Sequence, residues 1–167
     1  TPGVAARLRA RGLRTPIAVI PTGVPLPPAC PEEGWRARRV ALELPAERPL
    51  CLSVGRLAPE KNQAFLLAAF ARVAAALPDA RLVLAGDGDD RPRLARLADR
   101  LGLAGRVRFL GAVPPERLAG YHQAADLFLF PSTSETQGLA LLEAMAAGLP
   151  VVAVRSDAAQ DLLGEDR

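Results

Sequence analysis

Short apolar runs that alternate with helical patterns constrain the fold of this chain more than any other feature. Six such runs resemble strands that are covered on both faces of a sheet. They lie at 17–20, 50–54, 81–85, 107–110, 127–130 and 151–154. Helical spacing of Ala, Leu and Arg fills 62–77, 91–101, 115–125 and 138–147. The alternation predicts an α/β fold, a Rossmann-like doubly wound parallel sheet of about six strands.

The length of 167 residues suits one domain with a sizeable core. The segment 21–49 carries seven of the 16 prolines, and we expect a loop there with one short helix near 35–42. A helical pattern at 4–11 lacks a beginning, and another at 158–163 barely begins. We therefore expect residues 1–167 to be a single-domain fragment of a longer protein.

Composition and charge exclude several kinds of partner. The net charge is +3, but the 20 arginines are scattered among 18 acidic residues without a basic block, so no nucleic-acid partner is expected. Prolines or charges interrupt the apolar stretches, so no membrane span is expected either. Cys30 and Cys51 lack metal-ligand spacing, and we interpret them as small buried thiols of a protein in the reducing cytoplasm. His122, in a helical pattern, is interpreted as a surface or packing residue rather than a base.

The first candidate site follows the run 50–54, because ligands of open parallel sheets bind beyond the carboxyl ends of the strands. Gly55 would let a ligand approach the backbone, while Arg56 and Lys61 flank the mouth of the next helix, where an anion is favoured. Lys61 is the single lysine of the chain, and its compact ammonium binds phosphate differently from a guanidinium. The pattern predicts a phosphate or diphosphate site. Alternatively, both cations are solvated, with Glu60 as a local partner.

The loop after 81–85 begins like a dinucleotide-binding fingerprint. Gly86 and Gly88 match it, but Arg91 stands where the third glycine belongs, so the signal for an NAD-dependent oxidoreductase is weak. Asp89 and Asp90 would also repel a pyrophosphate. A tight turn that caps the next helix is the preferred interpretation.

The loop after 127–130 and the helix that follows it contribute two carboxylates. Glu135 immediately precedes amides at the helix start that can hold an anion. These amides belong to Thr136, Gln137, Gly138 and Leu139. Glu143 lies about two turns further on among apolar neighbours, where a carboxylate is costly to bury unless it meets a polar ligand such as sugar hydroxyls. The alternatives are that Glu135 caps the helix and that Glu143 is a solvated helix position.

Together, these segments resemble the C-terminal domain of the retaining glycosyltransferases of GT-B fold, in the large glycosyltransferase group 1, or family 4. The resemblance covers nearly the whole chain. Glu135 and Glu143, with seven residues between them, resemble the family's paired-glutamate motif. Asp157, Ala158 and Asp161 depart from the family pattern of two glycines and a glutamate. The matching stretches are 20–24, with Thr22 where the family usually has Asn, 54–62, 85–88, 107–111 and 125–153.

The resemblance implies a role for each candidate residue. Arg56 and Lys61 would neutralise the donor diphosphate, Glu135 would contact the transferred sugar, and Glu143 would contact the ribose hydroxyls. The reaction would transfer a hexose with retention at the anomeric carbon, and stabilising the departing diphosphate would lower the barrier. Glu135, Arg56 and Lys61 are thus the expected catalytic residues; Gly55, the amides of 136–139 and Glu143 would help to bind the donor. No metal or cofactor is required, since the nucleotide sugar, expected to be a UDP-sugar, is a substrate. The segment 111–114 would lie near the nucleobase.

The resemblance also implies a second, N-terminal domain that carries the acceptor site. That domain is absent from this chain, so we expect the isolated chain to be inactive. The stretch 136–139 resembles members that glycosylate lipids, such as diacylglycerol glucosyltransferases, which suggests a lipid or glycan acceptor and a cytoplasmic enzyme peripheral to the inner membrane. The alternative function is a non-catalytic Rossmann-like module that binds a protein partner, or a second copy of itself, through apolar faces left by the missing half.

Overall fold

The computed structural model describes residues 1–28, 34–47 and 49–164. Among them, five strands form one sheet of order β3-β2-β1-β4-β5, and every pairing is parallel. The strands are β1 (Leu50–Val54), β2 (Arg81–Ala85), β3 (Val107–Gly111), β4 (Leu127–Phe130) and β5 (Val151–Ala153). Their bounds agree within one residue with five of the predicted runs, so the doubly wound parallel sheet is confirmed.

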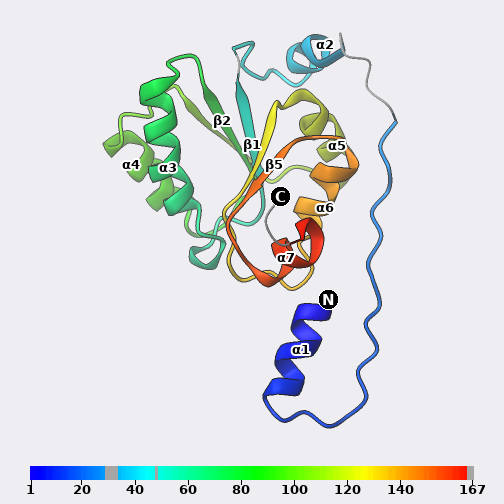
Figure 1. Ribbon diagram of the computed structural model, residues 1–167. Coiled ribbons are helices and arrows are strands. Elements are labelled where there is room, and N and C mark those ends of the chain that lie inside the picture. The colour runs from blue at the N-terminus through cyan, green and yellow to red at the C-terminus, as the bar shows by residue number, and fades with distance from the viewer. Residues whose placement is uncertain (29–33, 48, 165–167) are drawn as a thin grey trace.

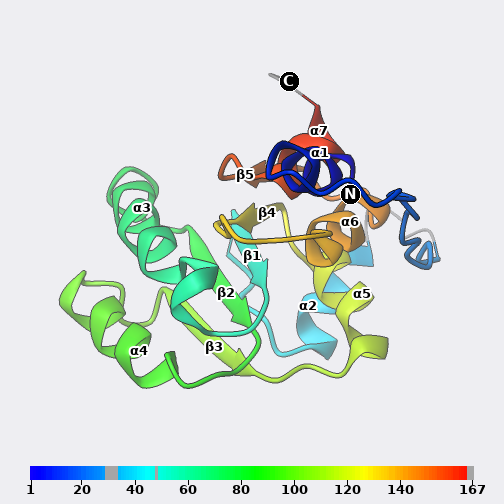
Figure 2. The same ribbon diagram turned by 90° about the horizontal axis from the view of Figure 1, so that it is seen from below.

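Helices cover both faces of the sheet, as Figures 1 and 2 show. One face carries α3 and α4, and the other carries α2, α5 and α6. The helices are α1 (Pro2–Ala10), α2 (Gly34–Ala41), α3 (Gln63–Ala76), α4 (Arg91–Arg100), α5 (Pro115–Ala124), α6 (Leu139–Ala146) and α7 (Asp157–Leu163), with a single 3₁₀ turn at Pro59–Lys61. The short helix predicted near 35–42 is confirmed as α2.

The core is divided between the two faces because successive strand side chains point in opposite directions. Leu52 and Phe128 belong to the cluster under α5 and α6. Their chain neighbours Cys51 and Leu127 face the cluster under α3 and α4. Burial of this kind on both sides explains why the strands read as nearly continuous apolar runs. Burial also raises the pKa of the Cys51 thiol to about 11. Cys30 lies outside the described residues.

The prediction of a sixth strand at 17–20 is wrong. This segment belongs to an extended connection between α1 and α2 that runs outside the sheet (Figure 1) and forms no ladder with any described strand. Ile20 is 82% exposed and Val19 is 40% exposed. Apolar composition alone therefore did not make a strand here, because a strand also needs a neighbour to satisfy its backbone. The preceding helix, α1, packs instead against α7, where Arg7 and Asp157 form an ion pair of 2.6 Å.

A buried arginine joins three parts of the fold. Arg39 of α2 is 1% exposed. Its Nε donates to the carbonyl oxygen of Ala124 and its Nη2 to Asp126 Oδ2, both at 2.8 Å. The same carboxylate oxygen accepts the amide of Leu50 at 2.7 Å. The pair thereby fixes α2 to the end of α5 and to the starts of β1 and β4, so the buried charge is compensated and hydrogen-bonded.

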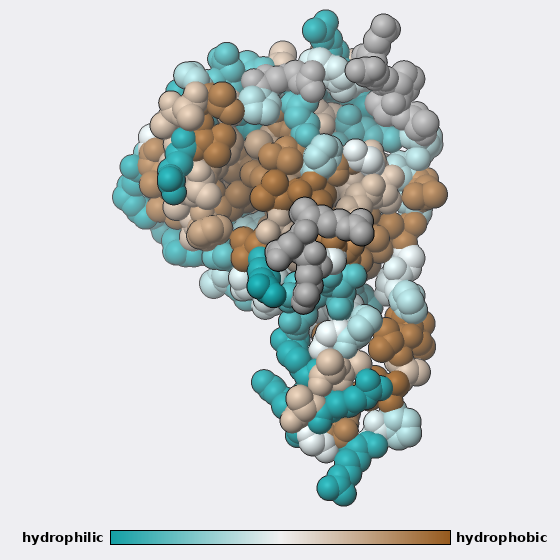
Figure 3. All heavy atoms as spheres, viewed as in Figure 1, coloured by the Kyte–Doolittle hydropathy of each residue, from teal (hydrophilic) through white to brown (hydrophobic). Residues whose placement is uncertain are grey.

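An apolar groove of about 480 Å³ lies between α3 and the β4–β5 end of the sheet. Figure 3 shows apolar side chains gathered in this hollow. Phe65 is 55%, Val73 39% and Leu77 49% exposed on or just after α3, and Val152 is 57% exposed on the edge strand β5. Phe65, Val73 and Leu77, the residue just after α3, are spaced in multiples of four, so they form a stripe along one side of the helix. This side of the helical layer is open in the described part of the chain.

His122 confirms the packing interpretation. It is 2% exposed and meets Phe128 edge to face, with ring centroids 5.6 Å apart. Burial lowers its pKa from 6.5 to about 4. An imidazole buried this deeply is neutral at physiological pH.

No helix within the described ranges has the length and apolar character needed to cross a bilayer.

Candidate functional site

The candidate site lies at the point in the sheet where the order in which successive strands are added reverses. The chain moves outward from β1 to β2 and β3, and then returns to the other side of β1 as β4 and β5. The helix after β1, α3, therefore covers one face, while the helix after β4, α6, covers the other. The loops that leave β1 and β4 diverge between these helices, which is where open α/β sheets bind ligands.

The loop after β1 begins with the main chain held against the next loop. Gly55 donates its amide to the carbonyl of Ala85, and Leu57 donates to the carbonyl of Asp87, both at 2.9 Å. A Cβ added at Gly55 would meet no atom within 4 Å. There is thus space on the Cβ side of Gly55, although its amide is already used, and the predicted approach of a ligand to its backbone stays a prediction. The loop then closes in the 3₁₀ turn Pro59–Lys61 and enters α3 at Asn62.

Lys61 and Glu135 are brought together across the two loops. Lys61 Nζ lies 2.6 Å from Glu135 Oε1, and the two side chains are 21% and 22% exposed. The residues are 74 positions apart in the chain, yet adjacent strands deliver them to one point. The ammonium is thus half-buried and held in place at the switch point, and an incoming anion would have to displace Glu135 from it.

Arg56 does not join this pair. Its side chain is 68% exposed and is paired with Glu60 through Nη2 and Oε1. The sequence left open the alternative that both cations are solvated, with Glu60 as a local partner. The structure shows this arrangement for Arg56 but not for Lys61. Arg56 also lines a small hollow of about 210 Å³ with Asp87 and Val113, at the ends of the first three strands. An exposed pair of this kind contributes only about 0–1 kcal/mol, so an anion in the crevice could readily exchange with Glu60.

The loop after β4 leads into α6 through a left-handed glycine. Gly138 has φ of 67° and precedes the first helical residue, Leu139. A Cβ at Gly138 would lie 3.3 Å from side-chain atoms of Ala158 and Leu162 in α7, so the turn is also closely packed. Thr136 and Gln137 lie in bends before the helix.

Only Leu139, of the four predicted amide donors, therefore belongs to the helix itself. The side chain of Gln137 is already engaged, since its Nε2 donates to Thr22 Oγ1 at 2.8 Å. One of its two side-chain N–H groups is thus directed to Thr22 and away from a ligand. The helix start remains a place where unpaired amides favour an anion.

Glu143 lies on α6 between the buried residues Leu141 and Ala144, and its own side chain is half-buried. Burial raises the pKa of its carboxyl above the ordinary value of 4.5. The charged form is therefore disfavoured unless a polar group meets it. The predicted contact with ligand hydroxyls is chemically suited to such a carboxylate, and stays a prediction.

Gly86 and Gly88 are explained by packing. A Cβ at Gly86 would lie 1.9 Å from the carbonyl oxygen of Gly55, and one at Gly88 would lie 2.3 Å from that of Leu57. Both glycines are thus needed because two loops touch main chain to main chain. This agrees with the preferred interpretation of a tight turn. The capping part of that interpretation is wrong: Asp90 occupies the N-cap position of α4 but makes no side-chain cap, and it pairs instead with Arg93 at 2.5 and 2.7 Å.

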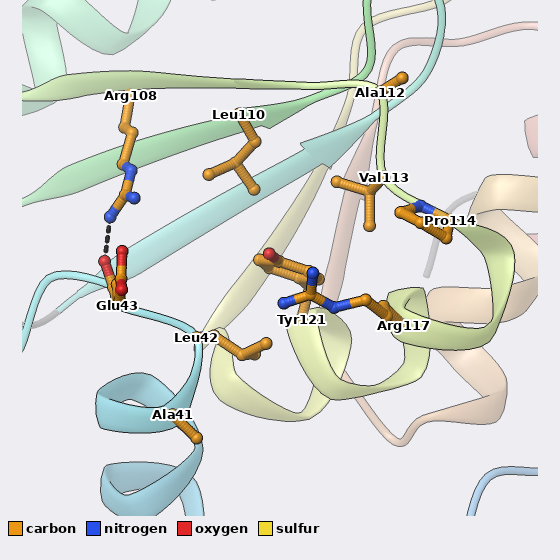
Figure 4. A pocket seen from close by; sticks show the side chains of 10 residues that line it. All are labelled: Ala41, Leu42, Glu43, Arg108, Leu110, Ala112, Val113, Pro114, Arg117 and Tyr121. Carbon is orange, nitrogen blue, oxygen red and sulfur yellow. Dashed lines mark hydrogen bonds between the residues drawn. The ribbon is translucent and has the colours of Figure 1, made fainter.

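A larger hollow of about 370 Å³ lies at the β3 edge (Figure 4). Val113 and Tyr121 line its apolar side, and Arg108 and Arg117 bring positive charge to it. Arg108 donates to the main-chain carbonyl of Glu43 and so connects β3 to the turn that follows α2. This hollow shares Ala112 and Val113 with the smaller one beside Arg56, so the predicted nucleobase segment 111–114 separates the two.

Sequence reasoning missed two further links between the loops. Asn62 Nδ2 donates to the carbonyl of Pro131, and Ser134 Oγ donates to the carbonyl of Glu60, each at 3.1 Å. An asparagine directly after the lysine at a helix entrance was a usable signal, since Asn is a turn and cap residue. In the parts of the chain that the structure covers, no group of three or more His, Cys, Asp or Glu is placed to hold a metal ion.

Comparison with known proteins gives consistent matches. The sequence profile of the family described as "Glycosyl transferases group 1" matches residues 36–167. Alpha-monoglucosyldiacylglycerol synthase of Streptococcus pneumoniae is 40% identical over 139 residues, which are 81% of this chain and 32% of that protein. The chain spans less than half the length of the curated relatives it matches.

Solved structures have the same fold. Sucrose-phosphate synthase from Thermosynechococcus elongatus superposes with a TM-score of 0.83 at 33% identity, over 96% of this chain and 41% of that one. HepE of Anabaena, in complex with UDP and glucose, has a TM-score of 0.71 at 30% identity and covers 80% of this chain and 36% of that one.

Proposed function

The chain belongs to the glycosyltransferase group 1 family, and we propose that it binds the nucleotide-diphosphosugar donor of a retaining hexosyltransferase. The observation that carries this proposal is the Lys61–Glu135 pair, 2.6 Å apart at the switch point of the sheet. Family membership and the parallel sheet of GT-B type make the crevice between β1 and β4 the expected donor site.

The charges at the crevice suit a departing diphosphate. Sugar transfer leaves negative charge on the diphosphate oxygens, and fixed positive groups stabilise that charge in the transition state. Lys61 supplies an organised ammonium, and Arg56 supplies a second cation once it exchanges Glu60 for phosphate. The amides around Gly138 would meet the same oxygens, while Gly55, whose own amide is donated to Ala85, would contribute by leaving room for the ligand.

The two glutamates would hold the sugar ends of the donor. A diphosphate that takes over Lys61 releases Glu135 to accept hydrogen bonds from the transferred hexose. Glu143, whose pKa is raised by burial, regains hydrogen bonds if ribose hydroxyls reach it. The nucleobase would lie against 111–114, next to the hollow beside Arg56. UDP is the expected nucleotide, supported by the UDP complex of the HepE relative.

The acceptor would bind to another part of the enzyme. Because the chain spans only 32% of the Streptococcus pneumoniae relative, we propose that residues 1–167 are the C-terminal donor domain and that an N-terminal domain carries the acceptor site. The name of that relative supports a lipid acceptor, although a glycan is the other candidate. A cytoplasmic enzyme peripheral to the inner membrane fits such an acceptor, and the isolated chain would bind donor without turnover.

Titration calorimetry tests the donor site directly. UDP should bind to the folded wild-type chain more tightly than GDP or ADP. Lys61→Ala should weaken UDP binding by about tenfold or more, because a charge-assisted contact is lost. Arg100→Ala, which removes a positive charge from the exposed end of α4, should leave the affinity unchanged. Absence of UDP binding, or equal affinities of wild type and Lys61→Ala, would refute the proposal.

A substitution of Glu135 tests whether this residue contacts the transferred sugar. Glu135→Gln removes a carboxylate that competes for Lys61, so affinity for UDP alone should stay equal or rise. Affinity for UDP-glucose should fall relative to UDP if Glu135 contacts the sugar. The opposite ranking would place Glu135 outside the sugar site.

The apolar groove supports a second candidate function, a non-catalytic module that binds a second copy of the chain. Phe65 and Val152 are more than half exposed on its rim, and β5 is an edge strand of the described sheet. Apolar area of this kind favours self-association. Sedimentation velocity of wild type and Phe65→Glu tests the idea: a dimer that the substitution dissolves would support it, and a wild type that stays monomeric at high concentration would refute it.

A further inference from the structure

The two site loops are held together by three polar contacts. Besides the Lys61–Glu135 pair, Asn62 donates to the carbonyl of Pro131 and Ser134 donates to the carbonyl of Glu60. The last two contacts reach main-chain oxygens, so they fix the paths of the loops and not only their side chains. The loop after β1 is thus attached to the loop after β4 on both sides of Lys61.

Asn62 occupies an unusual backbone conformation at this junction. It has φ of 62° and ψ of 27°, the left-handed region that L-residues other than Asn, Asp and Gly rarely adopt. The same residue ends the 3₁₀ turn at Lys61 and precedes the first residue of α3. A glycine would adopt this conformation more easily but would have no side chain to reach Pro131. Asparagine alone combines tolerance of the turn with an amide donor.

The next residue holds the other end of the loop. Gln63 is 5% exposed, and its Nε2 donates to the carbonyl of Arg56 at 2.8 Å. The segment between Arg56 and Gln63 is therefore closed on itself, and Asn62 is the point at which this closed loop is attached to Pro131. Loss of that attachment would leave only Ser134 and the ion pair itself to hold the loop against Glu135, so Lys61 should be less firmly placed.

We propose that Asn62 is a positioning residue that holds Lys61 against Glu135 and presents its ammonium to the donor diphosphate. This inference rests on the donor site proposed above and assigns a task to a residue whose side chain is directed to the carbonyl of Pro131. Asn62 acts through Lys61: it keeps the ammonium where an anion would meet it and so reduces the ordering cost of binding.

The composition of the chain provides a direct probe, because Lys61 is its only lysine. Acylation of Lys61 by an N-hydroxysuccinimide ester can be followed by peptide mass spectrometry, separately from the N-terminal amine. The Lys61 side chain is only 21% exposed in its ion pair. Loosening of the loop should therefore make it react faster, without any nucleotide present.

Asn62→Gly is the informative variant, since glycine keeps the left-handed turn and removes only the hydrogen bond. Lys61 should be acylated about three- to tenfold faster, and UDP affinity should fall by a similar factor. Ser134→Ala, which removes the second attachment, should change both quantities in the same direction. Gln123→Ala is the matched control: Gln123 Nε2 donates to the carbonyl of Pro28 at 2.7 Å, outside the site, and its removal should change neither.

A double-mutant cycle separates positioning from general stability. In a Lys61→Ala background, Asn62→Gly should have no further effect on UDP affinity, because Asn62 acts through Lys61. An undiminished effect there would overturn the proposal, as would wild-type acylation rates in both Asn62→Gly and Ser134→Ala. If acylation responds as expected but the wild type binds no UDP, the positioning of Lys61 stands and the proposed donor function fails.

Discussion

Replacement of Asp126 by Asn should destabilise the fold by about 3–5 kcal/mol. The Arg39 guanidinium is 2% exposed and lies 2.8 Å from the Asp126 carboxylate. Asparagine has nearly the same shape and can still accept one hydrogen bond, but it leaves the buried positive charge without a counter-charge. A cost of this size is a large fraction of the 5–15 kcal/mol typical of a whole domain. It should lower Tm by about 10 °C or more.

Urea denaturation at pH 7, followed by circular dichroism, measures this loss of unfolding free energy. Asp126→Leu should cost more than Asp126→Asn, because it also leaves the Leu50 amide without its acceptor. The double variant Arg39→Met with Asp126→Leu should be more stable than Asp126→Leu alone, since it removes the uncompensated charge. As a control, Glu60→Gln breaks the exposed pair with Arg56 and should change stability by less than about 1 kcal/mol. If Asp126→Asn and Glu60→Gln cost the same, the Arg39 charge is not desolvated and the reasoning is refuted.

Three further predictions concern stability. Burial lowers the pKa of His122 from 6.5 to about 4, so between these pH values the unfolded state binds more protons than the folded state. The free energy of unfolding should therefore fall by roughly 3 kcal/mol as the pH drops through this range. The urea midpoint should fall more between pH 7 and pH 4.5 in the wild type than in His122→Leu, and an equal fall in both would contradict this. The raised pKa of Glu143 means that the folded state holds this proton more tightly, so the contribution of Glu143 to stability is largest below its ordinary pKa of 4.5 and is lost as the pH rises. Glu143→Gln should therefore raise Tm at pH 8, and a lower Tm would show that the charged form is stabilised. Gly88→Ala should cost about 3 kcal/mol or more, because its Cβ would lie 2.3 Å from the Leu57 carbonyl oxygen; a cost below 1 kcal/mol in urea denaturation would mean that the loops separate freely.

The sheet was predictable because burial on both faces leaves a strong mark on sequence. Five apolar runs became strands at nearly their predicted bounds, whereas 17–20 has the same composition and remains outside the sheet. Strand composition records burial and β-propensity, but pairing depends on whether a neighbouring edge is available. The segment around Ile20 pairs with neither edge strand of the described sheet, and no property of its own sequence would reveal that.

The location of the site followed from topology, while its side-chain contacts did not. Once β1 and β4 are neighbours at the switch point, the loops that carry Lys61 and Glu135 start from the carboxyl ends of adjacent strands, so a shared crevice between them was predictable. The partner of Arg56 was not, because an exposed arginine chooses among nearly equal local partners. The cross-loop bonds of Asn62 and Ser134 were missed for a different reason: Asn62 marks a turn, but its acceptor and that of Ser134 are main-chain carbonyls, so the sequence does not indicate which loop these side chains reach.

A crystal structure of the chain soaked with UDP-glucose tests the central claim most directly. The account predicts that the diphosphate lies between the loops after β1 and β4, with an oxygen within about 3 Å of Lys61 Nζ and with Glu135 turned from Lys61 to the sugar. A nucleotide bound elsewhere, for example in the hollow beside Arg108 and Arg117, with the Lys61–Glu135 pair intact, would contradict it.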